Sequence, residues 1–157
     1  MTATVADGVH VTLPIELLAQ IAAGLAAAAP IDALPDTSGR RWSNIIRTDQ
    51  YEALIIAWPP GTGLAMHDHS GSLAALHVVS GRLRERYLES GPTQTSVTER
   101  WLEAGQQVEL SGDHTHEVVN VDEIEAISVH VYSPPLSDTA FRTNNELERE
   151  NEVPVDP

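Results

Sequence analysis

The chain has 157 residues, with 23 acidic side chains against nine basic ones and a formal net charge of −14. This charge argues against a nucleic-acid partner, which demands a basic face, and against binding to anionic lipid. Because the sequence contains no cysteine, disulfides, thiolate metal ligands and a cysteine nucleophile are excluded. The length suits one domain with a sizeable core, and we expect a single domain over residues 1–157.

The first long apolar segment predicts a helix. Apolar residues recur after Pro14 at positions 15, 17, 18, 21, 22 and 25, in an alanine-rich stretch. This is the spacing of one helix face, and proline is tolerated where a helix begins. The apolar run is too short to span a bilayer and lacks the cationic start of a signal peptide. We therefore expect a helical segment over 14–30 in a cytoplasmic protein with no membrane partner.

The character of the sequence changes at Trp42, where short runs rich in Ile, Val and Leu begin to alternate with turn residues. Such runs predict strands, near 42–48, 51–59, 73–80, 82–90, 96–103, 106–110, 116–121 and 124–133. Eight closely spaced strands are typical of an antiparallel sandwich or barrel. We expect the barrel over about 41–136 and an acidic tail, with a short helix or an arm, over 137–157.

Two histidines, His67 and His69, stand one residue apart. Side chains alternate between the faces of a strand, so the two imidazoles are expected side by side, where they can bind one metal ion. His116 is a third ligand candidate far downstream, and His114 competes with it because it has the same parity. Asp68 points the other way and is not expected to be a ligand.

A second polar pattern lies on the last predicted strand. Ser128, His130 and Tyr132 alternate with apolar residues and therefore share one face. Burying three polar side chains is costly unless they bond one another. A relay would satisfy them, in which the serine orients the imidazole and the imidazole orients the phenol toward the metal cavity.

The histidine motifs resemble those of the cupin superfamily. Cupins carry glycines on both sides of a His-x-His pair and a later histidine followed by an asparagine, and this chain offers Gly61 or Gly63, His67, His69, Gly81, His116 and Asn120. The asparagine spacing favours His116 over His114. Most cupins add a glutamate ligand three or four residues after the second histidine, but positions 72–74 hold no carboxylate. The resemblance implies a mainly β cupin barrel (double-stranded β-helix or jelly-roll) with one or two N-terminal helices.

The polar row, followed by Ser133-Pro134-Pro135, resembles the thiol dioxygenases of the cysteine dioxygenase family. The likeness covers roughly residues 41–136 and includes Trp58, nine residues before His67. Animal members crosslink the tyrosine to a cysteine that is Ala74 here, so the chain is identified as a member of the bacterial type I group that lacks this cysteine.

This resemblance implies an activity and a set of roles. Fe(II) would be bound by His67, His69 and His116, with Ser128, His130 and Tyr132 as catalytic residues. The enzyme would use O2 to oxidise a small thiol carboxylic acid to its sulfinate. Cysteine, 3-mercaptopropionate and related mercapto acids are the substrate candidates.

The family holds the substrate carboxylate with an arginine on the strand before the metal motif. An ungapped match puts Arg41 at that position, whereas matching the paired aliphatic residues puts Ser43 there. Arg41 and Arg47 share one face if the strand is regular. The substrate-binding candidates are Arg41, Arg47, a more distant Arg142, and His77 on the strand after the motif.

Two alternatives keep the same fold. One is another three-histidine cupin dioxygenase that acts on carbon, and the other is a non-catalytic cupin that binds a metal or a ligand. Three imidazoles also suit zinc, nickel and copper. The sequence gives no indication of oligomeric state.

Overall fold

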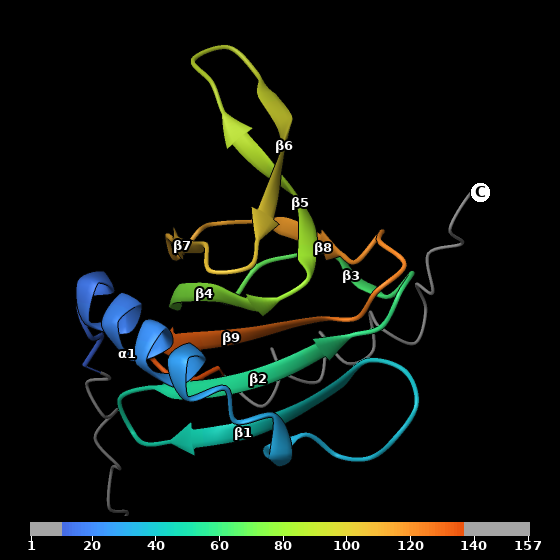
Figure 1. Ribbon diagram of the computed structural model, residues 1–157. Coiled ribbons are helices and arrows are strands. Elements are labelled where there is room, and N and C mark those ends of the chain that lie inside the picture. Colours follow the sequence, from blue (N-terminus) through green and yellow to red (C-terminus); the bar gives the residue numbers. More distant parts are fainter. Residues whose placement is uncertain (1–10, 137–157) are drawn as a thin grey trace, which may run out of the picture.

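A computed structural model of the chain describes residues 11–136 (Figure 1). Its helical elements are α1 (Ile15–Ala28) and the 3-10 helix η1 (Ile31–Ala33). Its strands are β1 (Arg41–Arg47), β2 (Glu52–Trp58), β3 (Gly63–His67), β4 (Leu73–Ser80), β5 (Arg82–Ser90), β6 (Thr95–Glu103), β7 (Gln107–Leu110), β8 (His116–Val119) and β9 (Ala126–Ser133). The predicted helix is confirmed, and every predicted strand is present within two residues of its expected ends. Strand β3 was not predicted, and the predicted acidic tail lies outside the described residues.

The strands form two antiparallel sheets that face each other (Figure 1). One has the order β1-β2-β9-β4-β7 and the other the order β3-β8-β5-β6. Helix α1 packs on the outer side of the first sheet, against β4 and β9, while the β5–β6 hairpin projects away from the barrel (Figure 1). The expected mainly β barrel with an N-terminal helix is confirmed.

The central strands of the larger sheet are buried on both faces. Every residue of β2 and of β9 is buried. Helix α1 and, over Ile55 and Ala57, the residues Leu34 and Ile45 cover the outer face, and the second sheet covers the other. Val129 and Val131 pack with Leu18 of the helix, whereas Tyr132 belongs to the cluster between the sheets. The alternation of β9 therefore turns Ser128, His130 and Tyr132 into the barrel.

A bulge in β1 corrects the expectation that Arg41 and Arg47 share one face. The pairing of β1 with β2 shifts register between Asn44 and Ile46. Arg41 lies opposite Ala57, whose side chain packs on the outer side of the sheet. Arg47 lies opposite Glu52, whose side chain is on the same inward side as that of Trp58. One extra residue in a strand reverses the faces beyond it.

The turn from β4 to β5 depends on Gly81. Its φ is +72°, and a Cβ atom there would lie 2.8 Å from the Cα atom of Ala126. Only glycine adopts this backbone geometry and this close approach without strain. The turn holds the start of β5 against the start of β9.

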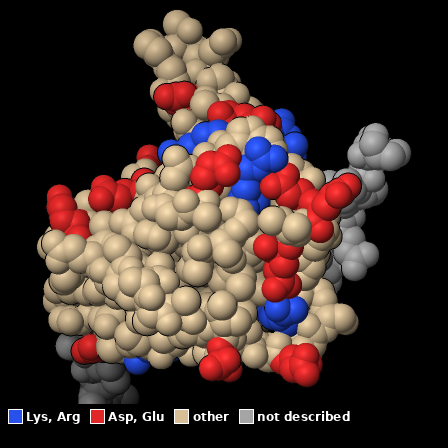
Figure 2. Space-filling model, viewed as in Figure 1, with Lys and Arg blue, Asp and Glu red and all other residues tan. Residues whose placement is uncertain are grey.

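Arginine side chains gather with carboxylates at the base of the β5–β6 hairpin (Figure 2). The ion pairs there include Arg82 with Asp122 at 2.7 Å and Arg84 with Glu117 at 3.7 Å. Within residues 11–136, no helix is long and apolar enough to cross a membrane.

Candidate metal centre

Three histidines from separate parts of the chain meet inside the barrel. His67 is the last residue of β3 and pairs with His116, the first residue of β8. His69 follows β3 in a turn. One ring nitrogen from each of the three lies within 4.8 Å of the other two, and all three side chains are buried.

The expectation that His67 and His69 sit on one strand is wrong, because β3 ends at His67. The Ser70 amide donates a hydrogen bond to Asp68 Oδ1 at 2.9 Å, and Ser70 and Gly71 have φ values of +53° and +90°. This Asx turn stops the strand and swings His69 toward His67, with ring centroids 5.2 Å apart. Asp68 shapes the turn and is exposed, in line with the expectation that it is no ligand.

Hydrogen bonds fix which nitrogen of two rings faces the centre. His67 Nδ1 lies 2.6 Å from the Ala65 carbonyl oxygen, and His116 Nδ1 lies 2.7 Å from Glu85 Oε1. These oxygens only accept, so each Nδ1 carries the proton and each Nε2 keeps its lone pair. The Nε2 atoms of His69 and His116 are 3.3 Å apart. Two nitrogens bound to one ion at about 2.1 Å are separated by roughly this distance.

Burial keeps these imidazoles neutral at pH 7. It lowers the pKa of His67 to about 4 and also lowers the pKa values of His69 and His116, and the neighbouring histidines add to the effect. Neutral imidazoles with inward lone pairs repel one another unless a cation lies between them. The donor set therefore fits a divalent transition metal and leaves its full charge uncompensated by the three ligands.

Ser128, His130 and Tyr132 form a hydrogen-bonded row beside the histidines. Ser128 Oγ is 2.8 Å from His130 Nε2, and His130 Nδ1 is 3.1 Å from the Tyr132 hydroxyl. The row has a fourth member that the sequence did not indicate. Trp58 Nε1 donates a hydrogen bond to Ser128 Oγ at 2.8 Å. The Tyr132 ring lies 5.1 Å from that of His69.

The indole donor gives this row a direction. Trp58 can only donate, so the Ser128 hydroxyl accepts from it and has its own proton left for His130 Nε2. His130 Nδ1 then carries a proton and donates to the Tyr132 oxygen, which leaves the phenol proton for an acceptor outside the row. Burial raises the pKa of Tyr132 above its ordinary value, and Glu52 adds to the rise, so the phenol stays protonated.

Arg40, which the sequence reasoning missed, brings a positive charge close enough to act on the polar row. Its guanidinium stacks 5.0 Å from the ring centroid of Trp58 and 5.4 Å from that of Trp42. Its charge acts on Tyr132, His67 and His130. Burial lowers the pKa of Arg40 to about 9, which leaves the side chain cationic at neutral pH.

The expected substrate-binding residues that the structure describes each have a polar partner. Arg41 pairs with Glu125 at 3.0 Å on the outer side, and Arg47 pairs with Glu52 at 2.5 Å beside a surface hollow of about 430 Å³. His77 Nδ1 bonds Gln107 Oε1 at 2.9 Å, and Gln107 donates to the helix carbonyl of Ala19. The His77 side chain therefore lies on the helix side of the sheet, away from the three histidines inside the barrel. Arg142 lies outside the described residues.

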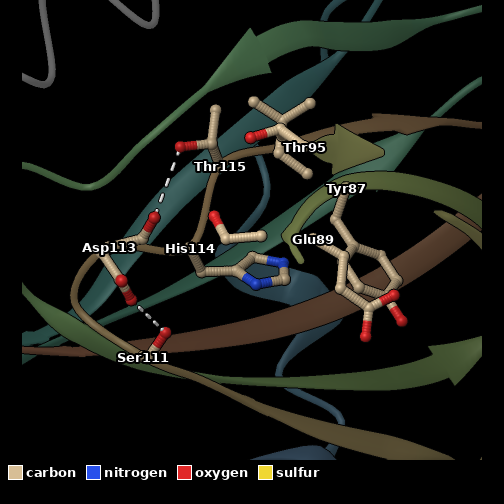
Figure 3. A pocket seen from close by; sticks show the side chains of 9 residues that line it. Tyr87, Glu89, Thr95, Ser111, Asp113, His114 and Thr115 are labelled. Atoms are coloured by element: carbon tan, nitrogen blue, oxygen red, sulfur yellow. Dashed lines mark hydrogen bonds between the residues drawn. The ribbon is translucent and has the colours of Figure 1, made fainter. Parts of the chain in front are cut away.

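His114 points toward Glu85 and a separate cleft. Its Nε2 is 2.8 Å from Glu85 Oε1, the oxygen that also receives His116. Figure 3 shows the His114 ring between the loop of Ser111 and Asp113 and the Tyr87 ring, on the wall of a cleft of about 380 Å³. Asn120 is structural, since its Nδ2 donates to the Trp58 and Ile124 carbonyls at 2.7 Å.

The two residues that sequence reasoning missed had a signal in the strand alternation. Arg40 precedes Trp42 by two positions and therefore shares the face of a large apolar residue. Glu85 follows Leu83 by two positions, and both are fully buried. A charged residue in register with core residues indicates a buried ionic role.

Comparisons with known proteins find one matching family and similar sequences. The family model for cysteine dioxygenase type I matches residues 17–144. Human cysteine dioxygenase type 1 is 31% identical over 111 residues, and the rat enzyme is 29% identical over 110 residues. Each match covers 66% of this chain and 54% of the relative. The chain thus spans about half the length of the curated relatives it matches.

Solved structures with low sequence identity share the fold. KdgF from Halomonas sp. has a TM-score of 0.56 at 20% identity, with 68% of this chain and 89% of that chain covered. An oxalate oxidase structure has a TM-score of 0.53 at 20% identity, with coverages of 62% and 52%. Together with the two antiparallel sheets, these neighbours confirm the expected cupin fold, and at this identity they carry the fold alone.

Proposed function

Because the chain belongs to the cysteine dioxygenase type I family, we propose that it is an iron-dependent thiol dioxygenase. In this proposal it oxidises a small thiol carboxylic acid to its sulfinate with O2. The convergence of His67, His69 and His116 beside the hydroxyl of Tyr132 is the observation that carries the proposal. Family membership supports a metal-dependent dioxygenase, and the choice of iron and of a thiol acid is our inference.

The reaction balances without any further reactant. One thiol and one dioxygen molecule give one sulfinic acid, in which both oxygen atoms are bonded to sulfur and the carbon skeleton is unchanged. When bound, Fe(II) supplies a Lewis-acidic, redox-active centre with open coordination positions for a thiolate and dioxygen. The three neutral imidazoles preserve its positive charge, which favours the deprotonated thiol.

The polar row has a defined task in this proposal. The direction of its hydrogen bonds leaves the Tyr132 proton for an acceptor outside the row, which in this proposal is the substrate or dioxygen. A preorganised donor of this kind stabilises negative charge that develops on the reacting atoms, at no cost in reorganisation. Ser128 and His130 act as positioning residues, because they fix the phenol and are themselves fully or nearly fully buried.

Arg40 is our candidate for the substrate carboxylate, in place of Arg41 and Arg47. It is cationic, it lies on the inward face with Trp42, and its charge reaches Tyr132. A guanidinium can bind a carboxylate through two parallel hydrogen bonds while its flat face stays on an aromatic ring. Stacking on Trp58 would hold that fork in one orientation and so select among thiol acids by length.

Oxygen consumption by the iron-loaded protein tests the proposal. A panel of cysteine, 3-mercaptopropionate and cysteamine, which lacks a carboxylate, should give uptake with at least one thiol acid and far less with cysteamine. Uptake without any thiol would favour a dioxygenase acting on another compound. Metal binding with no uptake for any thiol would favour a non-catalytic cupin.

A further inference from the structure

Glu85 is a buried carboxylate that the proposed chemistry does not yet use. It lies in the middle of β5, opposite Arg100 of β6 and Val118 of β8, and its exposed fraction is 0%. Burying a carboxylate is costly unless it is paired and hydrogen-bonded. An inward glutamate two strand positions from Tyr87, which pairs with His116, therefore needs an explanation.

Both oxygens of Glu85 are occupied by donors. Oε1 receives His116 Nδ1 at 2.7 Å and His114 Nε2 at 2.8 Å, and Oε2 receives Arg100 Nε. These three donors, one of them a guanidinium, form the charge-assisted hydrogen bonds of an ionised carboxylate. Glu85 is therefore an anion directly behind one candidate metal ligand.

We propose that Glu85 is the positioning residue of His116. Through the same contact it supplies a negative charge directly behind this ligand, whereas the three candidate ligands themselves carry none. This inference rests on the proposed three-histidine metal site. A carboxylate that accepts Nδ1–H fixes the tautomer and ring orientation of a metal-binding histidine and makes its Nε2 more basic. The three candidate ligands are all imidazoles, and positions 72–74 after His69 are Ser, Leu and Ala, so no carboxylate follows the motif.

His114 and Arg100 take supporting roles in this arrangement. His114 donates to the same oxygen as His116, so it holds the carboxylate in place rather than binding the metal. Arg100 binds the other oxygen and stacks 4.8 Å from the Tyr87 ring centroid. The three donors prevent Glu85 from rotating, which keeps Oε1 aligned with His116.

Anaerobic Fe(II) titration, with Co(II) as a second probe, measures the effect without thiol or oxygen. We expect Glu85→Gln to weaken metal binding about 10- to 100-fold, as for other residues that support a metal ligand from behind. Glu117→Gln is the matched control. Glu117 is next to His116 in the sequence, but its side chain faces Arg84 on the surface, so the substitution removes the same charge from a residue that does not contact the His116 ring. It should bind metal within about threefold of the native protein.

A second comparison separates positioning from a purely structural ion pair. Arg100→Gln breaks the pair with Glu85 but leaves the contact with His116, so its metal affinity should change much less than that of Glu85→Gln. Equal losses in the two variants, or an affinity of a folded Glu85→Gln protein within threefold of native, would overturn the proposal. Native protein that binds two metal equivalents, one of them lost in His114→Gln, would also overturn it.

A measurement on the native protein keeps the inference testable if the Glu85 variants do not fold. Nitrogen NMR of the histidine rings in the metal-free protein should show His116 protonated at Nδ1. A His116 ring protonated at Nε2 would contradict the proposal. Failure to oxidise any thiol would instead refute the proposed function, while metal affinity and the His116 tautomer would still decide the role of Glu85.

Discussion

Trp58 donates a hydrogen bond from its indole nitrogen to the Ser128 hydroxyl, 2.8 Å away. This contact joins β2 to β9 inside the barrel and gives the polar row its direction. Because an indole can only donate, the protons of Ser128 and His130 are all directed toward Tyr132. The phenol proton of Tyr132 is therefore left for an acceptor outside the row, and the first prediction follows from this.

Replacing Tyr132 with phenylalanine should lower turnover with the best thiol acid about 10- to 100-fold while leaving metal content unchanged. The change removes one donor that faces the reacting atoms and touches none of the three histidine ligands. Steady-state oxygen uptake and metal analysis measure both quantities. Tyr51→Phe removes a phenol that packs with the helix-side cluster and should be neutral. Metal loss in Tyr132→Phe would mean that the phenol supports the metal site itself.

Replacing Arg40 with glutamine should lower kcat/KM for the thiol acid about 10- to 100-fold, mainly through KM. The estimate corresponds to one charge-assisted hydrogen-bonding contact, worth about 1.5–3 kcal/mol. Arg41→Gln is the neighbouring control, and because Arg41 pairs with Glu125 outside the barrel it should leave kcat/KM nearly unchanged. A larger loss of kcat/KM in Arg41→Gln than in Arg40→Gln would mean that Arg41 binds the substrate carboxylate.

Removing His116 should abolish metal binding, whereas removing His114 should not. His116→Ala deletes one of the three converging nitrogens, and His114→Ala deletes a side chain whose nitrogen faces Glu85. Metal content after anaerobic loading distinguishes the two variants. Full occupancy in His116→Ala would show that His114 is the ligand.

The metal-free protein should lose stability as the pH falls from 7 to 5, in part through His130. Burial above all, with electrostatic effects of neighbouring His116 and Arg40, lowers the pKa of His130 to about 3, while Glu85 opposes the shift. An unfolded histidine takes up its proton near pH 6.5, so acid favours the unfolded chain. Over this range His130 contributes a loss of about 2 kcal/mol.

Urea unfolding at pH 7 and pH 5 checks the role of His130. The stability of His130→Gln should fall less steeply than that of the native protein over this range. His77→Gln, a substitution outside the polar row, serves as the control. Parallel curves for the native protein and His130→Gln would mean that His130 does not remain neutral in the fold.

Much of the site could be predicted from the sequence, because it depends on strand alternation. Ser128, His130 and Tyr132 share the inward face of β9, as their period of two predicts. His67 and His69 also lie together, but a turn at Asp68 is the cause, because β3 ends at His67 and the two residues do not share a strand. The His-x-His spacing therefore predicted the pair correctly, although a turn and not strand alternation produces it.

The positions of Arg41 and Arg47 could not be predicted from alternation alone. A bulge between Asn44 and Ile46 reverses the faces of β1, so Arg41 and Arg47 do not share a side. Ile45, the residue that the pairing skips, is a strand-forming residue and gives no sign of the bulge. Arg40 lies before the first residue of β1, where strand boundaries are least certain, so its inward orientation depended on packing against Trp58.

Labelled oxygen tests the central claim most directly. The iron-loaded protein should be incubated with cysteine or 3-mercaptopropionate under 18O2, and the product weighed by mass spectrometry. The account predicts a sulfinate that carries two labelled oxygen atoms, with one O2 consumed per thiol. A product labelled on carbon, or a disulfide with no label, would contradict it.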